Sequence, residues 1–290
     1  MNKLTFNLLI GILLFNFSSF SQKKPYLYIY ESIDSIVQFH GYDIAKKKMK
    51  QYEKKFIVNP LEIKHFIAHS LNNADISYAK SKLKFLSRHY GLIYTYKDTI
   101  DMQWAYNTNI NKTIYDNKLV DWMVKMNKKN YPKWLAEHYK EDILNQKLAI
   151  MDDKDQYMRG ICASFSSLDS SFSDSVMIKN DYENFLKLLT IYQYNDSIIP
   201  NPFDNGIYNP QGWMIIWHNL KDPDYTELVW TLLLPYVEKT YATGKIGKHY
   251  FEVYDYWLNE FFNEQYFGTL KNVPIRDAEN FEARKARYNL

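Results

Sequence analysis

Apolar positions along this chain repeat at helical spacing. Ala45, Met49, Tyr52 and Phe56 follow one another at steps of four, three and four residues. Such steps place the four side chains on one face of an α-helix. Pro60 follows, and because proline breaks helical hydrogen bonding, it predicts the end of this helix.

The same spacing recurs further along the chain. Gly91 stands where a C-cap is expected for the helix that carries Ile76 to Leu86. Pro132 predicts the end of a short helix over 119–126, and Pro235 predicts a kink or a division in a helix that starts at 222–224. The further stripes are Ile76, Ala79, Leu83 and Leu86; Phe185, Leu188, Leu189 and Tyr192; and Tyr250, Tyr254, Trp257, Leu258 and Phe261.

Polar stretches separate these helices. Residues 104–113 lose the helical pattern, which predicts a loop or linker. Residues 164–175 are rich in serine and predict an exposed loop. Asn180 or Asp181 is then expected to cap the next helix.

The pattern as a whole predicts an all-α, bundle-like fold in two helical parts, residues 22–130 and 131–290. Residues 26–30 and 92–96 alternate in hydrophobicity and could form a minor pair of short strands.

The amino-terminal residues predict a cleavable secretory signal peptide. Lys3 precedes an apolar run over 4–17, and the small residues Ser19 and Ser21 follow it. The run is shorter than the roughly 20 apolar residues that a membrane-spanning helix needs. We therefore expect cleavage before Gln22 and export to the periplasm or the medium, with no transmembrane segment in the mature chain.

Composition narrows the possible partners. A formal charge of +3 is too small to indicate a nucleic-acid partner. Cys162 is the only cysteine, so no internal disulfide can form, and a buried thiol is favoured over a reactive one. The sequence carries no phosphate-binding glycine loop and no G-x-S-x-G motif. It predicts no cofactor.

Asp152, Asp155, Gln156 and Arg159 share one helical face. Asp155 and Arg159 could pair at i, i+4, which on an exposed face contributes well under about 1 kcal/mol. Alternatively they form a polar pocket wall in which Arg159 binds an anion or orients a carboxylate. Spacing alone favours the solvated pair.

Asp255 lies on the same helical face as Phe251, Leu258 and Phe262. An unpaired buried carboxylate is too costly to persist, so Asp255 should have a partner. The expected partner is Arg159 or His218, with tyrosine hydroxyls next. His218 itself follows an apolar run and could be a core residue, a capping residue or a catalytic base.

Residues from about 144 to 270 resemble an uncharacterised bacterial family of domains of unknown function. The family pattern is D-Q-x-x-R, an apolar run ending in His, a D-P step, an Asp-containing helix and Q-x-Y-G-T. The matching positions here are Asp155, Gln156, Arg159, His218, Asp222, Pro223, Asp255, Gln265, Phe267, Gly268 and Thr269.

This resemblance implies a shared site that includes Asp155, Gln156, Arg159, His218 and Gln265, but it implies no activity. Two positions depart from the pattern, since Phe267 replaces a tyrosine and Tyr256 stands where an arginine is frequent. If those groups serve chemistry, this chain is altered or inactive. Gly268 and Thr269 are equally typical of a turn in which glycine adopts a positive φ.

Glu62, His65 and His69 have the E-x-x-H spacing of carboxylate-bridged metal bundles. No second copy of the motif appears, so a polar helix face is favoured over a metal site.

Two classes of function follow from the sequence, and a third possibility is that the polar residues only specify core packing. The favoured one is an exported helical protein that binds an envelope protein or a small ligand. The alternative is a hydrolase-like enzyme with His218 as general base, Arg159 stabilising negative charge, and Asp155 or Asp255 orienting the histidine.

Overall fold

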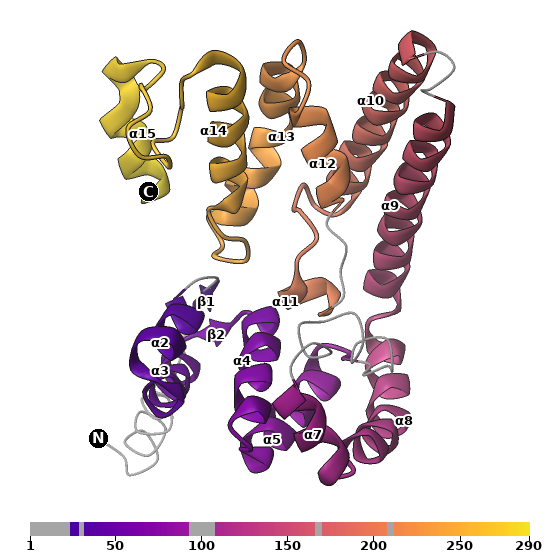
Figure 1. The fold of residues 1–290 in the computed structure, drawn as a ribbon, viewed down its shortest axis with the longest axis vertical. Coiled ribbons are helices and arrows are strands. Elements are labelled where there is room, and N and C mark those ends of the chain that lie inside the picture. Colours follow the sequence, from indigo (N-terminus) through magenta and orange to yellow (C-terminus); the bar gives the residue numbers. More distant parts are fainter. Residues whose placement is uncertain (1–23, 29–31, 93–107, 166–169, 208–211) are drawn as a thin grey trace, which may run out of the picture.

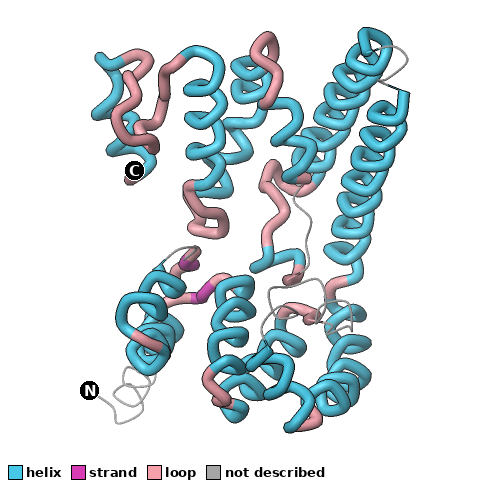
Figure 2. Tube along the Cα trace, in the orientation of Figure 1, coloured by secondary structure: helices cyan, strands magenta, loops and turns pink. Residues whose placement is uncertain are grey.

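The fold is all-α, as the periodicity predicted. The computed structural model describes residues 24–28, 32–92, 108–165, 170–207 and 212–290 (Figure 1). The predicted signal peptide lies outside these residues. Helices make up nearly all regular structure in the described ranges (Figure 2). No helix in these ranges has both the length and the hydropathy that crossing a bilayer requires.

The amino-terminal elements form the lower tier of Figure 1. They are β1 (Tyr26–Leu27), α2 (Ser32–His40), α3 (Tyr42–Lys55), β2 (Ile57–Val58), α4 (Pro60–Asn72), α5 (Ile76–His89), α7 (Thr108–Asp116) and α8 (Leu119–Glu137).

Most carboxy-terminal elements form the upper tier, with the long pair α9 and α10 standing at one side and the short α11 lower down, beside α4. They are α9 (Tyr139–Phe165), α10 (Ser170–Tyr194), α11 (Pro202–Asn205), α12 (Trp213–Leu220), α13 (Thr226–Tyr241), α14 (His249–Phe262), the short 3-10 helix η1 (Ala278–Asn280) and α15 (Phe281–Tyr288).

A short strand pair is present near the amino terminus. β1 pairs in parallel with β2, with Tyr26 opposite Ile57 and Leu27 opposite Val58. The first aromatic alternation thus contributes a strand, but its partner is the segment after α3. Leu92 is buried outside any strand, and 93–96 lie outside the described residues.

Each tier has its own hydrophobic core. The first core runs from Ile33 to Met126 along the sequence and the second from Leu148 to Tyr288. Ile207 belongs to the first core although it follows α11, so the chain returns to the lower tier before α12. The predicted boundary after Asn130 falls within α8, and the division into 22–130 and 131–290 stays a prediction.

Both internal prolines lie within continuous helices, so the predicted helix end at Pro132 is wrong and Pro235 does not divide its helix. Each proline is exposed, and so are Lys128 and Thr231, the residues four positions earlier that lose a helical hydrogen-bond donor. In α8 the buried positions Met123, Met126 and Trp134 continue one stripe across Pro132. Tertiary packing therefore outweighs the local cost of the proline.

Several predicted loops are helical. α7 covers much of 104–113 and buries Ile110. α9 and α10 cover the described part of the serine-rich segment 164–175. Asn180 and Asp181 both lie inside α10, so the predicted helix cap at either position is wrong. Ser173 is buried and donates to the main-chain oxygen of Cys162 (3.3 Å), so small side chains serve close packing of α9 on α10.

The first helix stops before Pro60. α3 ends at Lys55, and Pro60 is the first residue of α4. Asn59 caps α4, because its side chain accepts a hydrogen bond from the main-chain N–H of Leu61 (2.9 Å). Proline is favourable at the first position of a helix, where Pro60 stands. Cys162 is buried, as predicted.

Candidate functional site

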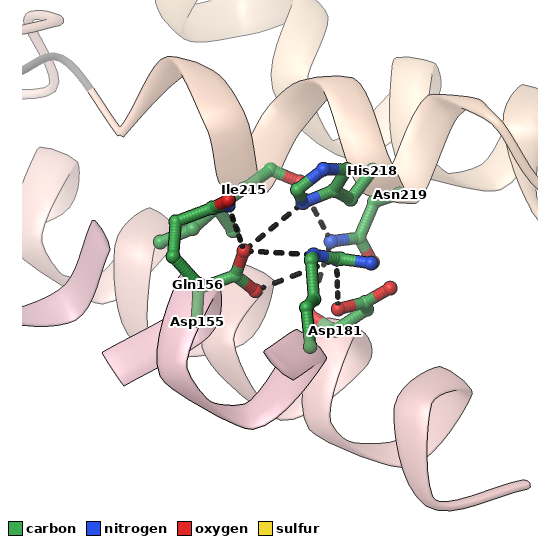
Figure 3. A network of polar contacts seen from close by, with 7 residues as sticks. Asp155, Gln156, Asp181, Ile215, His218 and Asn219 are labelled. Carbon is green, nitrogen blue, oxygen red and sulfur yellow. Dashed lines mark hydrogen bonds and ion pairs between the residues drawn. The ribbon is translucent and has the colours of Figure 1, made fainter. Parts of the chain in front are cut away.

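Asp155 is the centre of a polar network where α9, α10 and α12 meet (Figure 3). Its side chain is 0% exposed. Oδ2 accepts hydrogen bonds from Arg159 Nε and Gln156 Nε2, each at 3.0 Å, and lies 3.0 Å from His218 Nδ1. Burial alone would raise the pKa of Asp155, but the hydrogen bonds from His218 and Arg159 outweigh it and lower the pKa to about 2.

Arg159 joins this carboxylate to a second one. Its Nη2 lies 2.5 Å from Asp181 Oδ1, on α10. Asn219 donates to the main-chain oxygens of Asp181 (3.0 Å) and Ile215 (2.8 Å), which ties α12 to α10. The guanidinium is therefore shared between two carboxylates, and the network connects three helices.

A further carboxylate lies one turn before Asp155. Burial, together with the charge of Asp155, raises the pKa of Asp152 to about 6. Burial also raises the pKa of Asp181, against the lowering effect of Arg159. The site thus limits its negative charge, because only Asp155 is strongly held in its ionised form.

Asp155, Asp181 and His218 are the only described group of potential metal ligands close enough to share an ion, with one ligand atom of each within 4.8 Å of the others. Arg159 already contacts both carboxylates. The guanidinium therefore supplies the positive charge that a metal ion would bring, and an ion would have to displace it.

The chemical capability of the network is that of an Asp–His pair. Asp155 binds Nδ1 of His218, which orients the ring and leaves Nε2 as the atom that could accept a proton from a substrate. In the described ranges His218 hydrogen-bonds to no hydroxyl or thiol. A base that activates water is the chemistry this arrangement could support.

Asp255 does not join this network, so the predicted partners Arg159 and His218 are wrong. It is fully buried and accepts from the main-chain N–H groups of Tyr266 (2.7 Å) and Phe267 (2.8 Å). Its other oxygen accepts from the N–H (2.9 Å) and hydroxyl (2.8 Å) of Thr269. Burial was predicted correctly, but the role is to organise the loop after α14.

Gln265 belongs to the same loop. Its amide donates to the main-chain oxygens of Leu270 (3.0 Å) and Val273 (2.7 Å), and its Oε1 accepts from Leu270 N–H (2.8 Å). Gly268 has a φ of 77°, so the predicted positive-φ turn is confirmed. The Q-x-F-G-T motif therefore builds a structural loop.

Of the candidate residues, Asp155, Gln156, Arg159 and His218 converge, whereas Asp255 and Gln265 lie elsewhere. Sequence reasoning named Asp181 only as a possible helix cap and missed its place in this network. Asp181 lies four residues before Phe185 and so extends the stripe of α10 by one step, which was the available signal.

A cavity of about 800 Å³ lies apart from this network, between the β1 segment and the ends of α13, α14 and α15. Gly244 and Gly247 allow the two segments to approach, since a Cβ at Gly244 would lie 2.8 Å from the Tyr26 oxygen and one at Gly247 would lie 2.6 Å from the Tyr28 ring. The cavity is lined by residues 25–28, 241–244, 246–249 and 287–289 together with Glu238 and Glu252. None of the described residues of the Asp155 network lines it.

The E-x-x-H residues of α4, Glu62, His65 and His69, do not form a group of metal ligands among the described residues. His69 Nε2 lies 2.6 Å from Asp34 Oδ1. Burial, and secondarily the charge of Asp34, raises the pKa of Glu62 to about 8. Burial lowers the pKa of His65. A neutral Glu62 in the folded state is therefore the main electrostatic feature of this face.

Glu62→Gln is expected to remove a pH dependence of stability. The folded protein holds a proton on Glu62 that the unfolded chain, with a pKa of 4.5, releases, so wild-type stability falls as pH rises towards 8. Between pH 6.5 and 8 the slope of the wild type should be steeper than that of Glu62→Gln by about 1 kcal/mol per pH unit, because the histidines titrate in both proteins and only the wild type also loses the Glu62 proton. Urea unfolding at pH 6.5 and pH 8 measures the change in the free energy of unfolding, and Glu137→Gln, at an exposed position, is the control. An equal change with pH in the wild type and both variants would contradict the prediction.

No family model, no curated protein and no solved structure matches this chain. The resemblance to the uncharacterised bacterial family consequently stays a prediction.

Proposed function

We propose that this chain is an exported, non-catalytic protein that binds a small ligand in the cavity between β1 and the ends of α13–α15. The observation that carries the proposal is the cavity itself, whose volume of about 800 Å³ lies in the range of small-molecule sites. It is lined by tyrosines and a few charged groups, the mixture typical of such sites.

The polar network around Asp155 is a poorer candidate for a ligand site than the cavity. Arg159 balances Asp155 and Asp181, and the side chains of Arg159, His218 and Asp181 are only 22%, 12% and 15% exposed. These groups satisfy one another instead of facing a large open space. Their contacts fit a role in holding α9, α10 and α12 together.

Export rests on the sequence. The basic residue Lys3, the short apolar run and the small residues before Gln22 have the order of a secretory signal. Cleavage there would place the new amino terminus a few residues before Tyr26, which lines the cavity.

A hydrolase is the second candidate, because His218 Nδ1 lies 3.0 Å from a buried carboxylate. A histidine held in this way can act as a general base. The two candidates place the ligand at different residues, so one experiment separates them.

A small-molecule thermal-shift screen of the mature chain should yield ligands whose effect depends on Tyr28 and not on His218. Bound ligand stabilises the folded state in proportion to the logarithm of its concentration over Kd. With each shift measured from the variant's own Tm, Tyr28→Ala should reduce the shift and raise Kd at least tenfold. His218→Ala should leave both unchanged.

Tyr194→Ala is the matched control, since Tyr194 is 87% exposed and does not line the cavity. Ligands that lose binding in His218→Ala but keep it in Tyr28→Ala would favour the hydrolase. A screen with no ligand that depends on Tyr28 would contradict the proposed function.

A further inference from the structure

Aromatic rings form a supported platform at one side of the cavity. Tyr28 and His249 both line it, and their rings stack with centroids 5.8 Å apart and planes 25° from parallel. Trp213 packs against His249 (5.2 Å) and meets Tyr250 edge to face (5.0 Å). Trp213 and Tyr250 thus hold His249, on which the Tyr28 ring stacks.

Gly247 fixes where Tyr28 lies. A Cβ at this position would approach the Tyr28 ring to 2.6 Å, so glycine lets the ring rest on the backbone before α14. Tyr26, two residues earlier in β1, contacts Phe203 edge to face, with ring centroids 5.0 Å apart. The β1 segment therefore reaches the cavity in a defined position.

The charges in the lining are paired. Lys248 lies 3.3 Å from Glu252, and Arg287 lies 2.9 Å from Glu238. Burial lowers the pKa of His249 to about 4, so this ring is uncharged at neutral pH. Among the described lining residues positive and negative groups are thus equal in number.

This balance disfavours a charged ligand. An anion would have to compete with Glu238 or Glu252 for their cations, and a cation would have to compete with Lys248 or Arg287. A wholly apolar ligand would remove these ion pairs from water without replacing the lost hydrogen bonds. A neutral ligand with many hydroxyls can bind donors and acceptors of both pairs without breaking either.

We infer that the cavity binds a short, uncharged oligosaccharide, with the C–H face of a sugar ring on the Tyr28 platform and its hydroxyls towards the two ion pairs. This inference rests on the proposed function. The cavity volume of about 800 Å³ suits a ligand on the order of two sugar rings.

The test is titration calorimetry, with saturation-transfer NMR for weak binding, on the mature chain. The neutral probes are cellobiose, maltose and N,N′-diacetylchitobiose. Their charged counterparts are digalacturonate and deacetylated chitobiose. At least one neutral probe should bind saturably and at least tenfold more tightly than both charged ones.

The expected binding has two further signatures. Its Kd should change less than twofold between 50 and 500 mM NaCl, because no net charge is neutralised. Tyr28→Ala should raise Kd at least tenfold, and Tyr194→Ala should leave it unchanged.

The outcomes separate the ligand class from the cavity. Tighter binding of a charged sugar, or binding only of charged or non-sugar compounds that depend on Tyr28, would overturn the saccharide inference and keep the proposed function. Absence of any ligand that depends on Tyr28, in this panel and in the wider screen, would overturn both.

Discussion

Asp255→Ala is expected to lower the free energy of unfolding by about 4 kcal/mol, at the top of the range for single substitutions. The carboxylate of Asp255 accepts hydrogen bonds from the N–H groups of Tyr266, Phe267 and Thr269 and from the Thr269 hydroxyl. Alanine would leave these donors without an acceptor in a buried environment. Urea unfolding measures the loss.

Asp255→Asn should have an intermediate effect, because the amide keeps one acceptor oxygen. That oxygen can still accept the hydrogen bonds from the N–H groups of Tyr266 and Phe267. The NH2 group would then face the donors of Thr269. Hydrogen exchange should then show protection kept at 266 and 267 and lost at 269.

The exposed Asp153→Ala is the control and should change stability by less than about 0.5 kcal/mol. If Asp255→Ala unfolds within 1 kcal/mol of wild type and the loop amides stay protected, the carboxylate is not what organises the loop.

Asp255 also shows how far sequence reasoning reaches. Its steps to Phe251 and Leu258 predicted burial and the need for a partner, and both side chains are buried. The partner was not predictable from periodicity, because it is a set of amides in an irregular loop. Loop conformation depends on tertiary contacts that a helical pattern does not encode.

The polar network was partly predictable for the same reason. Asp155 and Arg159 are neighbours within one helix, so their pairing follows from i, i+4 spacing. His218 and Asp181 reach them only because α12 and α10 pack against α9. Spacing favoured a solvated pair, whereas packing buries Asp155 completely.

Helix ends were the least predictable feature. Pro132, Pro235 and the serines of 164–175 were interpreted by local propensity, as breaks or loops. α8 and α13 continue through the two prolines, and the described serines of 164–175 lie in α9 or α10, since buried positions in these helices pack against neighbouring elements. Local propensity predicts boundaries only where packing does not override it.

Asp155→Asn is expected to lower the free energy of unfolding by about 3 kcal/mol, the cost of removing one partner from a buried ion pair. The asparagine oxygen can keep the Oδ2 position, but the negative charge that pairs with Arg159 and holds His218 is lost, and the NH2 group would face Arg159 Nη2. Asp153→Asn, at an exposed neighbouring position, is the matched control.

The loss should depend on pH in a defined direction. The pKa of Asp155 is about 2 when folded and 3.8 when unfolded, so its ionised form stabilises the fold above pH 3.8, and this contribution is lost as pH falls towards 2. The difference between wild type and Asp155→Asn should therefore narrow by about 1 kcal/mol between pH 4 and pH 3. Unfolding by urea at these two values measures it.

Ligand binding and hydrolysis by Asp155→Asn distinguish a structural from a catalytic role of the Asp155 network. If Asp155 serves only to hold α9, α10 and α12 together, ligands that depend on Tyr28 should bind Asp155→Asn with Kd within twofold of wild type at temperatures where the variant is folded. If stability is unchanged while hydrolysis of an ester substrate by wild type disappears in Asp155→Asn, the Asp155–His218 pair is catalytic. Because Asp155 is completely buried and its Oδ2 is hydrogen-bonded to Gln156, Arg159 and His218, we expect the first result.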